Sequence, residues 1–131
     1  MRMTWLVLAA ILPLVAGAVP AVASAGVTPL HGLEFTGLAS WYGPGLRGRH
    51  TASGEIFNPK ALTAAHPTLP FGTLVEVSRV NRKKSVVVVI TDRGPFVAGR
   101  AIDLSRAAAR RLHMSYLGTA EVRIQVIGMV E

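Results

Sequence analysis

Short segments in which apolar and polar residues alternate, separated by turn residues, dominate the chain from residue 38 onward. Residues 73–80 and 121–127 alternate in the way that is typical of a half-buried strand. Residues 38–42 combine apolar and aromatic side chains before a Gly-Pro-Gly turn, which also favours a strand. Five consecutive β-branched residues at positions 86–90 predict a strand that is buried on both faces, as in a closed barrel or a covered sheet.

A single strong helix signal begins at Ser105. The Ser105 hydroxyl is placed to cap the amides of Ala107 and Ala108. Good helix formers follow as far as Leu112, and the basic side chains of the last turn suit the negative end of the helix dipole. The whole pattern therefore predicts a mainly β fold, and a barrel, with one short α-helix.

The first 25 residues have the pattern of a signal peptide. Arg2 is followed by no further charged residue until Glu34, residues 5–18 are apolar, and residues 23–25 are Ala-Ser-Ala, which suits cleavage after position 25. An uncleaved membrane anchor is the alternative, because the apolar stretch approaches the roughly 20 residues that span a bilayer. We expect cleavage, with export to the periplasm or cell envelope and no stable membrane insertion afterwards.

The remaining chain is expected to hold a lead-in at residues 26–35 and one domain at residues 36–131, large enough for a single core. Fourteen Lys and Arg against seven Asp and Glu give a net charge of +7. In an exported protein this charge favours anionic envelope polymers over nucleic acid, although it also suffices to keep a domain soluble. Cysteine is absent, so the core alone must hold the domain together. Nothing in the sequence implies a cofactor, and we expect a monomer.

Two of the seven carboxylates, Glu55 and Asp92, stand at turns beside apolar segments. Glu55 lies within a polar, Gly-rich loop at residues 44–59, a length that is usually functional, and Asp92 follows the β-branched run at 86–90. Such positions suit acid and base chemistry. His66, just before an apolar turn, is a candidate to bond a substrate hydroxyl or to hold one of the carboxylates in place. The alternatives are a turn hydrogen bond for Asp92, a solvated Glu55 and a structural role for His66. These three residues are also a conceivable metal-ligand set, but no short-spaced His or Cys motif supports one, so we predict no metal site.

Five motifs follow one another between residues 37 and 105. They are GLASWYG at 37–43, TASGE at 51–55, ALTAAHPTLPFGT at 61–73, VVVVITDRGPF at 86–96 and GRAIDLS at 99–105. In this series the chain resembles the rare lipoprotein A family, which is similar in fold to barwin, expansins and family 45 endoglucanases. The resemblance implies a six-stranded double-psi β-barrel with one short α-helix. Members are often lipoproteins, whereas this chain has no cysteine to acylate.

The resemblance also implies an activity, that of a lytic transglycosylase on peptidoglycan glycan strands. Such an enzyme cleaves the β-1,4 bond between MurNAc and GlcNAc and leaves 1,6-anhydroMurNAc ends, in cell-wall remodelling or daughter-cell separation. Asp92 would be the catalytic acid, with Glu55 and His66 as the other members of the cluster. Two alternatives remain: a β-1,4-glycan hydrolase, which the same carboxylates permit, and an expansin-like module that binds or loosens the wall without cleaving it.

Four residues near these groups are candidates for binding the substrate: Trp41, Tyr42, Arg93 and Phe96. Trp41 and Tyr42 are neighbours on a predicted strand, so their side chains should point to opposite faces. We expect one to stack on a sugar ring while the other packs in the core. Asp103 is expected to serve the start of the Ser105 helix.

Overall fold

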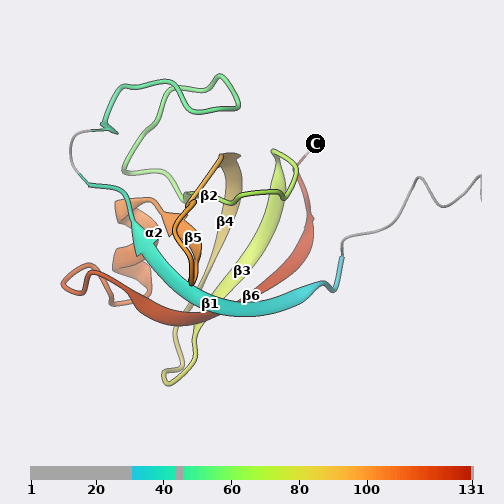
Figure 1. Ribbon diagram of the computed structural model, residues 1–131, viewed down its shortest axis with the longest axis vertical. Coiled ribbons are helices and arrows are strands. Elements are labelled where there is room, and N and C mark those ends of the chain that lie inside the picture. Colours follow the sequence, from blue (N-terminus) through green and yellow to red (C-terminus); the bar gives the residue numbers. More distant parts are fainter. Residues whose placement is uncertain (1–30, 44–45, 131) are drawn as a thin grey trace, which may run out of the picture.

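A computed structural model describes residues 31–43 and 46–130 of the 131-residue chain. The expected signal peptide lies outside these residues. Six strands form one closed barrel in the order β1-β5-β2-β4-β3-β6 (Figure 1), which confirms the predicted fold class. Their bounds are β1 (Glu34–Trp41), β2 (Thr63–Ala65), β3 (Thr73–Arg79), β4 (Ser85–Asp92), β5 (Arg100–Leu104) and β6 (Ala120–Met129), with helix α2 (Arg106–Arg111) between the last two. No helix of the described residues is long and apolar enough to cross a membrane.

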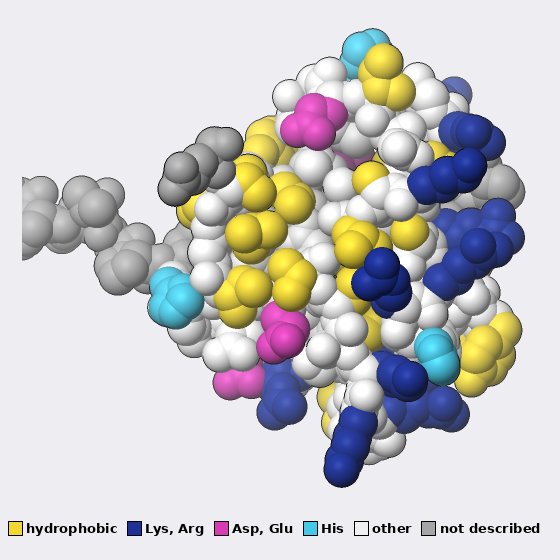
Figure 2. All heavy atoms as spheres, turned by 180° about the vertical axis from the view of Figure 1, so that it is seen from behind, with side chains coloured by type: hydrophobic (Ala, Val, Ile, Leu, Met, Phe, Trp, Pro, Cys, Tyr) yellow, Lys and Arg dark blue, Asp and Glu magenta, His cyan; other side chains and the backbone are white. Residues whose placement is uncertain are grey.

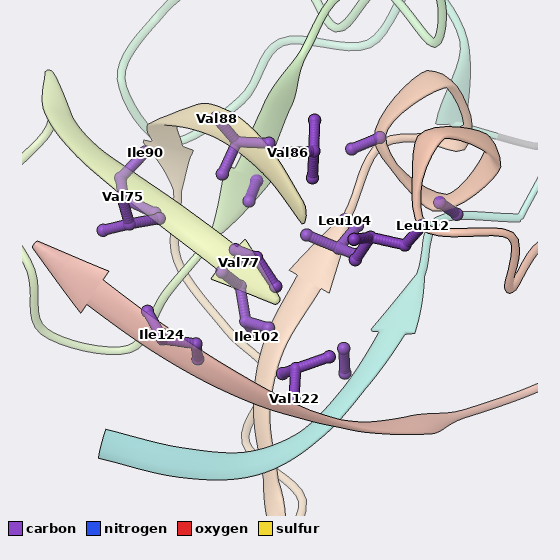
Figure 3. Close-up of a cluster of buried hydrophobic side chains, with 14 of the residues drawn as sticks. Val75, Val77, Val86, Val88, Ile90, Ile102, Leu104, Leu112, Val122 and Ile124 are labelled. Carbon is purple, nitrogen blue, oxygen red and sulfur yellow. The ribbon is translucent and has the colours of Figure 1, made fainter. Parts of the chain in front are cut away.

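The alternating segments bury one face each, as their pattern predicts. Val75 and Val77 of β3 and Val122 and Ile124 of β6 are fully buried and point into the barrel interior (Figure 3). Leu112, just after α2, joins the same cluster, so the helix packs against the barrel core. Every second residue of the long antiparallel strands thus contributes to the core. The packed core holds in place the strand ends, which carry polar residues.

Strand β4 is buried on one face only, so the prediction of two-sided burial is wrong. Val88 and Ile90 have no exposed surface, whereas Val87 is 40% exposed. A strand of a closed barrel has one face toward the interior and one toward the outside, and the outer face of β4 is left partly exposed at Val87 and Val89. The β-branched run therefore reflects strand propensity, which suits any pleated and partly covered surface.

Two short strands that the pattern did not indicate join the barrel in parallel pairs. β5 pairs parallel with β1, and β2 pairs parallel with β4. The β2–β4 register shifts between Ala64 and Ala65, so Ala65 lies opposite Asp92 on one side and opposite Asp103 of β5 on the other. Strand β1 begins at Glu34, inside the range expected for the lead-in. These pairings bring the ends of β1, β5, β2 and β4 together.

Helix α2 begins as predicted, with one difference. The Ser105 Oγ accepts a hydrogen bond from the amide of Ala108 at 3.2 Å, as the N-cap pattern indicates. The amide of Ala107 instead donates to the carbonyl of Pro59 at 3.0 Å. The helix start is therefore tied to the long loop that precedes β2.

Candidate active site

Asp92 is the last residue of β4, and its carboxylate accepts three hydrogen bonds from three segments. Oδ1 accepts from the backbone amides of Ala52 at 2.9 Å and Arg93 at 2.8 Å. Oδ2 accepts from the Tyr42 hydroxyl at 2.8 Å. The side chain remains half-buried, so it is held in one orientation without being sealed from solvent. A carboxyl group fixed in this way is suited to proton transfer at a bound substrate.

The loop that carries Glu55 folds onto Asp92. Besides the amide of Ala52, the amide of Ser53 donates to the carbonyl of Thr91 at 3.2 Å. The loop is closed internally, since the amide of Thr51 donates to the carbonyl of Glu55 at 2.7 Å. The Glu55 side chain itself is exposed. The fold thus brings the Glu55 loop and Asp92 into one place, with the second carboxylate on the solvent side.

Tyr42 follows β1 and lies between the core and Asp92. Its ring packs edge-on against Phe57, with 4.8 Å between ring centroids. Burial raises the pKa of the Tyr42 hydroxyl, and the hydrogen bond to Asp92 and the charges of Asp92 and Asp103 raise that pKa further. The hydroxyl therefore stays protonated near neutral pH and remains a donor. Sequence reasoning assigned Tyr42 to the substrate and missed this contact, because residues 42 and 92 meet only through the barrel.

His66 is buried beside Asp92, and its imidazole supports a turn. Its backbone amide donates to the Asp92 carbonyl at 3.1 Å. Its Nδ1 accepts from the amides of Thr68 at 3.1 Å and Leu69 at 3.0 Å, so in the neutral ring the proton lies on Nε2. Burial, and then the positive charge of Arg93, lower the pKa of His66. The neutral ring therefore fixes the turn after β2 next to the carboxylate.

Arg93 clamps that same turn. Its Nη1 donates to the carbonyls of His66 at 3.1 Å and Leu69 at 2.7 Å. The guanidinium also lies 4.0 Å from the centroid of the Phe71 ring, a cation–π contact. Nη1 of Arg93 is thus engaged within the protein, whereas the neighbouring Phe96 is 82% exposed.

Trp41 and Tyr42 line a hollow of about 300 Å³ that opens next to the Asp92 site. The Trp41 indole packs against the core, and its Nε1 donates to the carbonyl of Leu117 at 3.1 Å. Arg47, Phe57 and Arg106 also line the hollow. The described part of the chain contains no group of three His, Asp or Glu close enough to hold a metal ion.

Asp103 makes a polar cluster across β1 and β5, and it does not serve the helix start as expected. Arg100 Nη2 donates to Asp103 Oδ1 at 2.6 Å, and both Arg100 and the Ser40 hydroxyl take part in the same network. Arg100 lies three residues earlier on the same strand, whereas Ser40 is the register partner of Asp103 across the β1–β5 ladder. Only the strand pairing reveals this contact.

The six strands form a closed barrel with parallel β1–β5 and β2–β4 pairs, which defines a double-psi β-barrel protein. The Asp92 carboxylate, held where those strands end, marks a candidate active site. The chain belongs to the family described as lytic transglycolase, whose family model matches residues 34–124. The membership confirms the resemblance on which the expected fold and activity depend.

Relatives named endolytic peptidoglycan transglycosylase RlpA are similar over most of this domain. The protein of Campylobacter jejuni is 53% identical over 92 residues, which cover 70% of this chain and 34% of the relative. That of Helicobacter pylori J99 is 54% identical over 97 residues, 74% of this chain and 31% of the relative. A probable member from Nostoc is 58% identical over 98 residues, which cover 73% of this chain and 26% of the relative. The chain spans about a third or less of the length of these relatives.

Solved structures show the same fold. The Streptomyces papain inhibitor superposes with a TM-score of 0.60 at 25% identity, covering 74% of this chain and 96% of the inhibitor. An expansin from Clavibacter michiganensis superposes with a TM-score of 0.57 at 20% identity, covering 72% of this chain and 50% of the expansin. The expansin match is evidence for the barrel alone.

Proposed function

We propose that this domain is an endolytic peptidoglycan lytic transglycosylase that acts in the cell envelope, in wall remodelling or daughter-cell separation. The observation that carries the proposal is the Asp92 carboxylate, which is held by Tyr42, Ala52 and the Arg93 amide at the strand ends. Its position falls in the matched region of a family whose similar members are named for this activity. The substrate is the glycan strand of peptidoglycan.

Asp92 acts first as acid and then as base. Its Oδ2 accepts from Tyr42 with one lone pair, which leaves a second position on that oxygen for a proton. The proton passes to the glycosidic oxygen as the bond from the MurNAc C1 to that oxygen breaks. The MurNAc 6-hydroxyl oxygen then bonds to C1 and returns its proton to Asp92, so that no water is consumed. The three hydrogen bonds keep the carboxyl group aligned through both steps.

Glu55 and His66 support this chemistry in different ways. The Glu55 carboxylate is exposed on the loop that folds onto Asp92, and its negative charge stabilises an oxocarbenium-like transition state or orients the 6-hydroxyl. His66 holds the turn beside Asp92 and offers Nε2–H to a sugar hydroxyl. Tyr42 positions Asp92, while Trp41, Arg93 and Phe96 are the remaining candidates for contact with the sugar.

Product analysis by mass spectrometry tests the proposal. The secreted protein incubated with purified peptidoglycan should release fragments with 1,6-anhydroMurNAc ends. Asp92→Asn should release none and remain folded, because the amide oxygen can still accept from Ala52 and Arg93. The matched control is Glu121→Gln, an exposed carboxylate on β6, which should release products at the parent rate.

Two outcomes would replace the proposal. Reducing MurNAc ends would show a hydrolase that activates water. Binding to peptidoglycan with no soluble product from the parent protein would show a non-catalytic wall-binding module.

A further inference from the structure

A second hollow, of about 700 Å³, lies beside helix α2, and the charged side chains of its lining are all Lys or Arg. We call it the cationic groove. Its six Lys and Arg residues are Arg47, Lys60, Lys84, Arg106, Arg110 and Arg111. Among the residues that the structure describes, no Asp or Glu lines it, so the groove presents one sign of charge in a concave surface.

Separate segments of the chain build this charge. Arg106, Arg110 and Arg111 come from α2, Lys84 from the turn before β4, and Arg47 and Lys60 from the long loop before β2. The Lys and Arg side chains visible in Figure 2 likewise crowd one side and the lower end of that face, away from most acidic side chains. The fold therefore concentrates a positive charge that the sequence spreads over more than 60 positions.

The groove cations are not neutralised from within the described chain. The ion pairs among residues 31–43 and 46–130 are Arg100–Asp103 and Arg123–Glu34, and neither involves the groove. Like charges within about 10 Å repel one another at moderate salt, and a bound anion relieves that repulsion. The ordinary explanation of such charge is a basic surface that keeps the protein soluble. That explanation does not account for the concave shape of the groove or for its position next to the active site.

The cationic groove is continuous with the site. Arg47, Pro59 and Arg106 line both the groove and the smaller hollow that Trp41 and Tyr42 border. The Tyr42 hydroxyl binds Asp92 at 2.8 Å. A polymer that crosses Asp92 and extends through the smaller hollow therefore reaches the cationic groove.

We propose that the cationic groove binds the carboxylates of the same peptidoglycan strand that Asp92 cleaves, an inference that rests on the proposed function. Each MurNAc of a strand carries a carboxyl group, either free on its lactyl ether or at the end of an attached peptide stem. Guanidinium groups pair with carboxylates through two parallel hydrogen bonds, and the groove holds four arginines. The groove thereby selects acidic wall glycan over neutral β-1,4 glycans.

The test compares two double variants that remove the same charge. Arg110→Gln/Arg111→Gln changes the groove, and Arg82→Gln/Lys83→Gln changes two exposed cations outside its lining. Both are made in the Asp92→Asn background, so that the polymer stays intact, and circular dichroism checks their folding. Co-sedimentation with insoluble peptidoglycan at low and high salt gives the affinity.

We expect the groove variant to bind peptidoglycan on the order of tenfold more weakly at low salt, and the control variant to bind like its parent. The difference should disappear at high salt and on peptidoglycan whose carboxylates have been converted to amides. Glycan strands stripped of their stems by an amidase no longer sediment, so their binding is measured in solution by fluorescence anisotropy. A retained difference between the variants assigns the lactyl carboxylates, and a lost difference assigns the stems.

Equal weakening by both double variants, or a difference that persists on amidated peptidoglycan, would overturn the inference. So would a groove-dependent affinity for anionic phospholipid vesicles with no effect on peptidoglycan. Failure of the proposed function is separate, because it appears as a parent protein that releases no anhydro ends while the charge-dependent binding persists.

Discussion

Tyr42 and Asp92 lie 50 residues apart in the sequence and are joined by a hydroxyl–carboxylate hydrogen bond of 2.8 Å. Tyr42 comes directly after β1 and Asp92 ends β4, two strands that are separated in the barrel by β5 and β2. The Tyr42–Asp92 hydrogen bond therefore links the two outer members of a set of four neighbouring strand ends. It connects the smaller hollow that Tyr42 lines with the carboxyl group proposed to transfer the proton.

Tyr42→Phe should lower kcat about tenfold or more, because a hydrogen bond to a charged group contributes about 1.5–3 kcal/mol. The ring contact with Phe57 is kept, so the protein should still fold, with a thermal midpoint lowered by no more than the lost hydrogen bond accounts for. Initial rates of anhydro-end formation across a range of peptidoglycan concentrations measure the effect. A loss confined to KM would instead show that Tyr42 contacts the substrate without positioning Asp92.

Glu55→Gln should lower kcat on the order of a hundredfold if its negative charge stabilises the transition state. Because the side chain is exposed and the loop is closed through the backbone of Glu55, folding should be unaffected. Steady-state kinetics and a melting curve are compared with those of Glu121→Gln, which removes an exposed charge on β6. A Glu55→Gln variant with the kcat of that control would leave Asp92 as the sole catalytic carboxylate.

His66 predicts a pH dependence of stability. Its pKa in the folded protein is lowered, mainly by burial, so the unfolded chain takes up a proton near pH 6.5 before the folded protein does. The stability that neutral His66 confers is therefore complete above about pH 6.5 and is lost as the pH falls toward the folded pKa. Urea unfolding between pH 7.5 and 5 should show a slope of up to about 1.4 kcal/mol per pH unit from this group.

The His66→Asn variant should flatten that slope, since its amide oxygen can accept from Thr68 and Leu69 without titrating. His113→Gln, at an exposed histidine after α2, should keep the slope. An unchanged slope in His66→Asn would assign the pH dependence to another group.

The long strands and the helix cap could be predicted because each carries its own periodic signal. Residues 73–80 and 121–127 alternate, and Ser105 stands before good helix formers. Strand β2, with three residues, is too short for any period, and β5 acquires its strand conformation from its partners β1 and β2. Local patterns do not encode such non-local pairing. The six-stranded barrel was therefore predicted from the family resemblance.

The residues of the site were predictable as candidates, but their contacts were not. Asp92 and Glu55 were selected from turns and family motifs. The hydrogen bond from Tyr42 to Asp92 and that from Ser40 to Asp103 depend on which strands become neighbours. The position of Arg93 under the turn carbonyls likewise depends on tertiary packing, since its neighbours lie 24 and 27 residues earlier. The local sequence thus indicates which residues can carry the chemistry, whereas the closure of the barrel determines which of them come into contact.

Gly37 allows β1 and β5 to approach closely enough for that closure. A Cβ at position 37 would lie 2.6 Å from the Ala101 Cβ, which is far inside van der Waals contact. Gly37→Ala should therefore push the two strands apart and lower the free energy of unfolding by about 1–3 kcal/mol. Adding Ala101→Gly should restore part of the lost free energy of unfolding. Gly118→Ala, whose added Cβ meets no atom within 4 Å, should leave that free energy nearly unchanged. Chemical denaturation measures all four proteins, and a Gly37→Ala variant as stable as the parent would show that β5 shifts without cost.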